Sequence, residues 1–269
     1  MEQSGTSALL QGAVQDLASG VVSALRGGDH VRVSGTGAED VPTGSLTLPA
    51  VRVVGADLLL PQVLFGTPPD VAEIAVFRKA VEAFPPRGDA APTVRWSHWA
   101  MRRTLHRFEA DPHDTPPDPL AQGPTSTDQD TDTDTDTDTD TDTDTGTGTG
   151  PDTDTDVDTD WLDGASWQLL THQLAVLAPL AVPGAECAVS EAARRRPVDV
   201  ARGFVRAVRR RDWQQAAGAG RWLTLLDGVP PELGLETGLD FVDLMGGDDP
   251  RVALQVQAAR VMRATGAAV

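Results

Sequence analysis

Apolar side chains recur every three or four residues near the start of the chain, and the same spacing returns between residues 67 and 109. This period is typical of helices that bury one face. Gly27 and Gly28 are expected to end the first helix, and prolines bound two later ones, over residues 67–84 and 94–109. The apolar positions of the first helix are Leu10, Val14, Leu17, Val21 and Leu25.

Three segments between these helices show patterns that favour β-strands. Ser45–Val54 alternates apolar and other positions, with a slip at Pro49, and Leu58–Phe65 is almost continuously apolar. His30–Ser34 is a shorter candidate, and glycines and prolines separate the three. We therefore predict an α+β domain with a small sheet over residues 1–110.

The chain beyond residue 160 shows helical periodicity and turn residues throughout. Pro197 and Pro250 stand where a first helical residue is expected, and Asp249 is placed to cap the second of these helices. Short connections between helices of this length favour helical hairpins, so we predict an all-helical domain over residues 161–269. The predicted helices are Trp161–Ala178, Glu186–Arg196, Val198–Arg211, Trp213–Leu226, Glu232–Met245 and Pro250–Ala264.

Residues 111–160 separate the two predicted domains and differ from both in composition. They hold 17 Asp and no Glu, Lys or Arg, mostly as a Thr-Asp alternation from Asp128 to Asp160. Apolar burial cannot offset the ordering entropy of such a segment, and we predict a disordered polyanionic linker over residues 111–160. The formal net charge of −18 belongs almost entirely to it, since the other residues carry 23 acidic and 22 basic side chains.

Two basic clusters are the strongest candidates for a binding site. In the first, Arg95, His98, Arg102 and His106 share one face of a predicted helix that also carries two tryptophans. That face could be simply solvated, could bind an acidic protein, or could bind nucleic acid by phosphate contacts and stacking. His106, Glu109 and His113 do not form a complete metal-ligand set, and we predict no bound metal.

The second cluster lies on the predicted helix that begins near Pro197. Arg202, Arg206, Arg209 and Arg210 are placed opposite its apolar stripe, which is typical of a solvated face or of a surface for anionic partners. No helix-turn-helix or RNA-binding signature accompanies the arginines, so nucleic acid is the less favoured partner.

Other features restrict the class of protein. A single cysteine, Cys187, excludes an intramolecular disulfide framework, and no nucleophile motif or cofactor-binding motif is complete. The sequence analysis finds no clean apolar run of membrane-spanning length, the nearest being the interrupted stretch Leu169–Val189. We expect a soluble cytoplasmic protein without a membrane partner or a cofactor.

These observations favour a non-enzymatic protein-interaction or scaffold protein whose helical half binds a protein partner. A nucleic-acid-associated regulatory protein that uses the arginine-rich helices is the first alternative. An enzyme with a site near His98 and His106 is the second. We also hypothesise that the Asp-rich segment contacts the arginines of residues 194–211 in a salt-sensitive manner.

Overall fold

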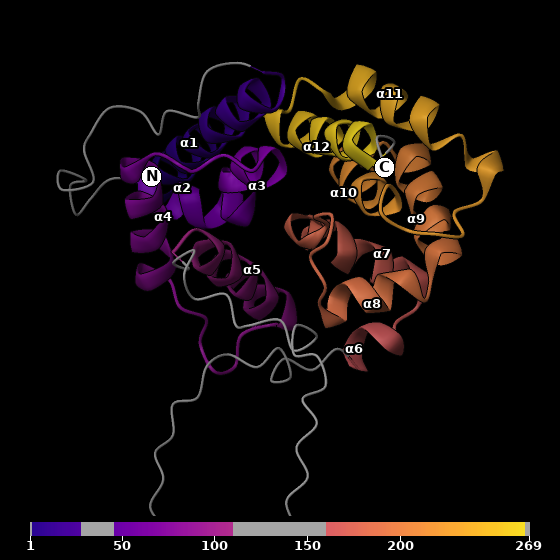
Figure 1. Ribbon diagram of the computed structural model, residues 1–269, viewed down its shortest axis with the longest axis horizontal. Helices are drawn as coiled ribbons and strands as arrows, with labels where there is room; N and C mark the ends of the chain where they lie inside the picture. Colours follow the sequence, from indigo (N-terminus) through magenta and orange to yellow (C-terminus); the bar gives the residue numbers. More distant parts are fainter. Residues whose placement is uncertain (1, 28–45, 110–159, 267–269) are drawn as a thin grey trace, which may run out of the picture. The chain divides into compact units, whose positions relative to one another are not determined.

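The computed structural model describes residues 2–27, 46–109 and 160–266, and all regular secondary structure in these ranges is helical (Figure 1). The α+β prediction for residues 1–110 is therefore wrong for the part that the structure describes, which contains no strand. The helical prediction for the chain beyond residue 160 agrees with the structure. The predicted strand His30–Ser34 and the Asp-rich segment lie outside the described residues.

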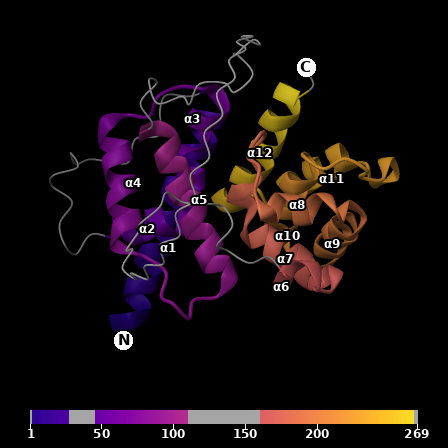
Figure 2. The same cartoon turned by 60° about the horizontal axis from the view of Figure 1, so that its bottom comes forward.

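The N-terminal segment consists of helices that pack in sequence order. Figures 1 and 2 show α1, α2, α4 and α5 as neighbours, and α1 packs on α2, α2 on α4, and α4 on α5. Asp70 begins α4, because its carboxylate accepts a hydrogen bond of 2.7 Å from the backbone N–H of Ala72. The elements are α1 (Glu2–Leu25), α2 (Thr47–Val54), the 3₁₀-helix η1 (Gly55–Leu59), α3 (Leu60–Phe65), α4 (Val71–Ala83) and α5 (Pro92–Glu109).

The two predicted strands within the described range form helices for a packing reason. In α2, Ala50, Val51 and Val54 are buried while Val53 is 57% exposed, so burial follows the helical period and not an alternation of two. The apolar run from Leu58 is buried at three successive positions, where η1 passes into α3. A short, continuously apolar run does not distinguish a buried strand from a buried helix.

The C-terminal segment is arranged around α10. This helix packs against α7, α9, α11 and α12, and every residue from Ala216 to Leu223 is buried. Its elements are α6 (Asp160–Asp163), α7 (Trp167–Val176), the 3₁₀-helix η3 (Ala178–Leu180), α8 (Ala188–Arg194), α9 (Pro197–Arg210), α10 (Trp213–Leu223), the 3₁₀-helix η4 (Pro231–Leu233), α11 (Leu235–Gly246) and α12 (Pro250–Gly266).

Small residues allow α7 to approach both α9 and α10 closely. A Cβ atom added to Gly218 of α10 would lie 2.8 Å from the carbonyl oxygen of Ala175 in α7. A Cβ atom added to Gly203 of α9 would collide with the side chain of Thr171, also in α7. These two glycines therefore set the separation of three helices.

The described residues before and after the 110–159 gap belong to one unit. Helix α1 packs on α12, and a buried ion pair joins Asp57 of η1 to Arg221 of α10 at 2.7 Å. Gln255 of α12 accepts a hydrogen bond from Arg221 and donates one to Asp57, and Arg221 also donates to the Ala181 carbonyl. This buried network fixes α10 against residues that are distant in sequence.

Two helical stretches would be long and apolar enough to cross a membrane, by length and composition alone. Within the described residues they are Gly5–Leu25 and Thr47–Phe65, which were not expected from the sequence because polar residues and glycines interrupt both apolar stretches. Both stretches supply core side chains, such as Val21 and Leu58, and buried core helices meet the same criterion. The cytoplasmic location stays a prediction.

Candidate functional site: an arginine patch on α9

Helix α9 separates its apolar and basic side chains onto opposite faces. Val200, Ala201, Phe204 and Ala207 are buried, and Pro197 starts the helix where the missing N–H costs no hydrogen bond. The four predicted arginines are exposed and line a shallow surface depression of about 550 Å³. We call this surface the arginine patch, and it consists of Trp167, Arg202, Val205, Arg206, Arg209 and Arg210.

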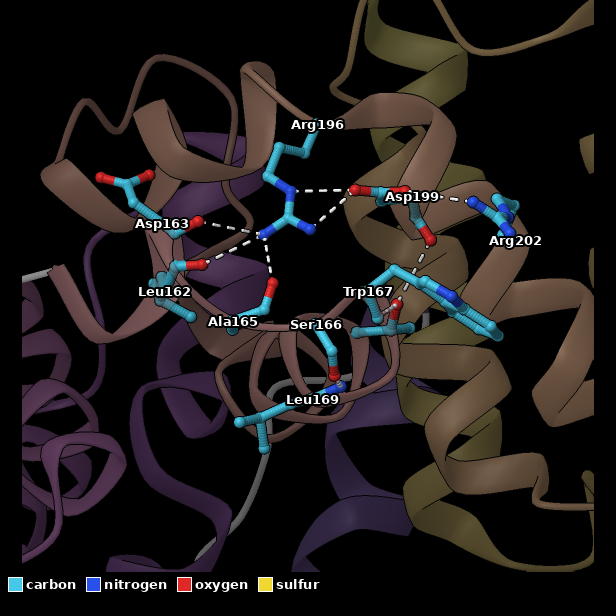
Figure 3. Close-up of polar contacts among 10 residues, drawn as sticks. Leu162, Asp163, Ala165, Ser166, Trp167, Leu169, Arg196, Asp199 and Arg202 are labelled. Atoms are coloured by element: carbon cyan, nitrogen blue, oxygen red, sulfur yellow. Dashed lines mark hydrogen bonds and ion pairs between the residues drawn. The ribbon is translucent and has the colours of Figure 1, made fainter.

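Arg196, one residue before α9, holds the turn between α6 and α7 against the start of α9 (Figure 3). Its Nε and Nη2 donate hydrogen bonds of 2.9 and 2.7 Å to one carboxylate oxygen of Asp199. Its Nη1 donates to the backbone carbonyls of Leu162, Asp163 and Ala165, the shortest of these being 2.7 Å, to Ala165. One guanidinium thereby fixes the turn that leads into Trp167.

Local contacts then place the ring of Trp167 beside α9. Ser166 caps α7, because its hydroxyl accepts a hydrogen bond from the backbone N–H of Leu169 (Figure 3). The hydroxyl of Thr171 donates to the Trp167 carbonyl at 2.8 Å, and the side chain of Thr171 packs against Gly203. The first turn of α7 is thus held directly against α9.

Two of the four arginines lie over the indole ring. The guanidinium carbons of Arg202 and Arg206 are 5.1 and 5.6 Å from the ring centroid of Trp167. Such cation–π contacts hold the guanidinium groups in place while their N–H groups stay able to bind an anion. Val205, 40% exposed, adds an apolar surface between them.

The positive charge of the arginine patch is not neutralised within the described residues. Arg202 lies 3.8 Å from the carboxylate of Asp199, which already pairs with Arg196, and Arg206, Arg209 and Arg210 form no ion pair there. The other arginines of residues 160–266 do have carboxylate partners. Apart from the arginines of α9 and its C-cap residue Arg211, each one pairs with a carboxylate within 3.5 Å. These are Arg194, Arg195, Arg196, Arg221, Arg251, Arg260 and Arg263.

The helix dipole accounts for part of this arrangement. Arg209 and Arg210 occupy the last turn of α9, where a cation is stabilised by about 0.3–1 kcal/mol. That effect does not explain Arg202 and Arg206, which lie in the middle of the helix. Arg202 and Arg206 lie on the exposed face of α9, opposite its buried stripe, as the amphipathic period predicts.

The second predicted cluster, on α5, has less uniform surroundings. Arg95, Arg102 and His106 are exposed, whereas His98 is half-buried and its Nδ1 atom is buried without a hydrogen-bond partner among the described residues. Burial lowers the pKa of His98, and the nearby charges of Arg52 and Arg102 lower it further. A neutral His98 would add no positive charge to this face.

The geometry of α5 gives no support to a metal or catalytic site. His98 and His106 are two turns apart, about 12 Å along the helix axis, and His98 is half-buried whereas His106 is exposed. Within the ranges that the structure describes, no group of three metal-ligating side chains comes together, and His113 lies outside those ranges.

Sequence reasoning missed two contributors to these sites. Trp167 is separated from Arg202 by 34 intervening residues. The single predicted helix Trp161–Ala178 is divided in the structure into α6 and α7, because Ser166 lies between them as the N-cap of α7. The Asp57–Arg221 pair was missed as well, although an arginine within the run Ala216–Leu223 of small and apolar residues is a recognisable signal of a buried charge.

The comparisons with known proteins add no relationship. No family model, no curated protein and no solved structure matches this chain.

Proposed function

We propose that this protein is a non-enzymatic interaction protein that binds an acidic segment of a protein partner through the arginine patch. The observation that carries the proposal is the group of four arginines beside Trp167, of which Arg202 shares Asp199 at 3.8 Å and the other three form no ion pair among the described residues. Tryptophan and arginine are the residues most enriched at binding hot spots. A carboxylate matches the fork of N–H groups on each guanidinium.

The composition of the patch favours a protein over nucleic acid. Val205 and the Trp167 ring form an apolar centre within the arginines, which suits an apolar side chain flanked by carboxylates. The arginines from Arg202 to Arg210 span only about 12 Å along α9, which is short for a surface that follows a phosphate backbone. Nucleic acid is therefore the alternative that the experiment below must exclude.

A second surface is consistent with a role in protein interaction. Helix α11 exposes Phe241, Leu244 and Met245 near its C-terminal end, and Leu244 is 80% exposed. Apolar residues grouped on a surface are typical of interaction sites.

The test measures binding of two labelled probes to the full chain by fluorescence anisotropy at low salt. One probe is a peptide in which glutamates flank a central leucine, and the other is a single-stranded oligonucleotide of the same formal charge. We expect the peptide to bind more tightly. The triple variant Arg206→Gln, Arg209→Gln, Arg210→Gln should lose about tenfold in peptide affinity, the sum of three exposed charge contacts.

A matched control removes the same charge elsewhere. Arg26, Arg87 and Arg263 are exposed and lie outside the patch and outside the basic cluster of α5, so replacing all three by glutamine should leave peptide affinity nearly unchanged. Equal losses in both triple variants would mean that the peptide responds to net charge alone and would overturn the proposal. If the oligonucleotide binds more tightly than the peptide, the arginine patch is a nucleic-acid site and not a protein site.

A further inference from the structure

A cavity separate from the arginine patch lies between α5 and the segment that joins η3 to α8. Its volume is about 430 Å³, within the range of pockets that hold small molecules. Its wall is mostly apolar, and the larger apolar contributors are Leu60, Val63, Trp99, Leu180 and Val182.

The charged side chains of the cavity are basic, and Thr104 adds a neutral hydroxyl. Arg103 is held in place, with its guanidinium carbon 5.0 Å from the Trp99 ring centroid and with Nη1 donating to the backbone carbonyl of Glu186. Arg107, one turn further along α5, is exposed and forms no ion pair within the described ranges. His106 also lines the cavity, and none of the lining residues that the structure describes carries a carboxylate.

The acidic side chain of Glu186, the residue before the lining residue Cys187, is already neutralised. The carboxylate of Glu186 accepts two hydrogen bonds from Arg194, and this pairing lowers its pKa. The charge presented by the cavity wall is therefore positive, beside an apolar interior. A ligand that matches both properties carries an anionic group at one end and an apolar body at the other.

We infer that this cavity binds a small organic carboxylate with an alkyl or aromatic body. The body would occupy the space between Leu60, Trp99 and Val182, and the carboxylate would lie at Arg103 and Arg107. A pocket with convergent polar groups and an apolar wall is the usual form of a small-molecule site. This inference is independent of the acidic-partner proposal, because none of its residues belongs to the arginine patch.

Cys187 offers a specific reporter of this site. It lines the cavity and is the only cysteine in the chain, so alkylation of the protein by iodoacetamide reports on this place alone. Burial raises the pKa of the Cys187 thiol, and its reaction should be slow and faster at alkaline pH. A ligand in the cavity should slow it further.

The experiment compares three probes on the full chain: octanoate, 1-octanol and acetate. Octanoate should slow the alkylation of Cys187 severalfold at saturation, and 1-octanol should need about tenfold higher concentration because it lacks the charge-assisted hydrogen bonds. Acetate, which has no apolar body, should have no effect. Absence of protection by octanoate, or equal protection by 1-octanol, would overturn the inference.

Three variants test whether octanoate protects Cys187 by binding in this cavity. Arg107→Gln should weaken octanoate about tenfold and leave 1-octanol unchanged, whereas Arg95→Gln, on the same helix but outside the cavity, should change neither. Ala185→Leu places a larger side chain in the half-buried wall and should weaken both probes. Unchanged circular dichroism would show that each variant is folded. Equal effects of Arg107→Gln and Arg95→Gln on octanoate binding would contradict the placement of the carboxylate at Arg107.

Discussion

Glu73 is a buried carboxyl whose protonation state affects the stability of the fold. It is 3% exposed, and its Oε2 accepts a hydrogen bond of 2.9 Å from Gln62 Nε2, while Oε1 has no partner among the described residues. Burial raises its pKa from 4.5 to about 7. A backbone hydrogen bond from Asp70 opposes this shift and the charge of Asp70 adds to it. The protonated carboxyl is thus the form that the fold favours.

The direction of the pH dependence follows from that shift. At pH values below the unfolded pKa, the carboxyl is protonated in both the folded and the unfolded chain, and this group's contribution to stability is fully present. As the pH rises from about 4.5 to about 7, the unfolded chain ionises first, and the free energy of unfolding falls.

Glu73→Gln should remove this dependence. The variant should match the parent protein near pH 4 and exceed its free energy of unfolding by about 2 kcal/mol near pH 8, measured by urea denaturation. Glu82→Gln is a suitable control, because Glu82 is exposed on the same helix. Identical pH profiles for the Glu73→Gln variant and the parent would contradict a raised pKa at this position.

At the level of elements, the helices with strong starting signals were predictable from the sequence. Pro197 and Pro250 were predicted as first helical residues, and α9 and α12 begin at these two residues. The segment Ser45–Val54 was misassigned, because valines at alternating positions resemble a strand until the packing of α1 and α4 on α2 is known. The arginines of α9 were predictable from its period, but the ring of Trp167 beside them depends on the α7–α9 packing, which local sequence does not encode.

That packing leads to a prediction about Gly203. Gly203→Ala should lower the free energy of unfolding by about 2 kcal/mol, because a Cβ atom at this position would overlap Thr171 and push α7 away from α9. It should also weaken binding of the acidic peptide, because Trp167 would move from the arginines.

The control for Gly203 is another helical glycine. Gly12 lies inside α1 with open space around its missing Cβ, so Gly12→Ala should stabilise the protein by about 0.5–1 kcal/mol. Thermal and urea denaturation of the two variants, followed in parallel, measure both effects. An unchanged free energy of unfolding in the Gly203→Ala variant would contradict the prediction, because it would mean that α7 and α9 can move apart without loss of stability.

At the scale of the whole molecule, charge is distributed very unevenly. Fourteen Asp lie between Asp128 and Asp160, whereas three of the four arginines in the arginine patch form no ion pair among the described residues. An acidic probe and the chain's own Asp residues would thus compete for the same guanidinium groups.

Deletion of residues 128–160 should therefore raise the affinity of the acidic peptide at low salt. The gain should shrink above about 0.3 M salt, where the Debye length falls below about 6 Å. The triple arginine variant should show no gain on deletion, and this comparison separates competition at the patch from a general change in net charge. An affinity that the deletion does not change would argue against any competition.

The buried Asp57–Arg221 pair also has a consequence for the integrity of a cut chain. Its partners lie on opposite sides of residues 110–159, and each half alone would leave a charged side chain and the α1–α12 surface unpaired. A single peptide-bond cleavage between residues 128 and 150 should thus yield two fragments that stay associated, elute together and unfold in one transition. In the Arg221→Met variant the two fragments should separate, because Asp57 of one fragment then has no ion-pair partner in the other.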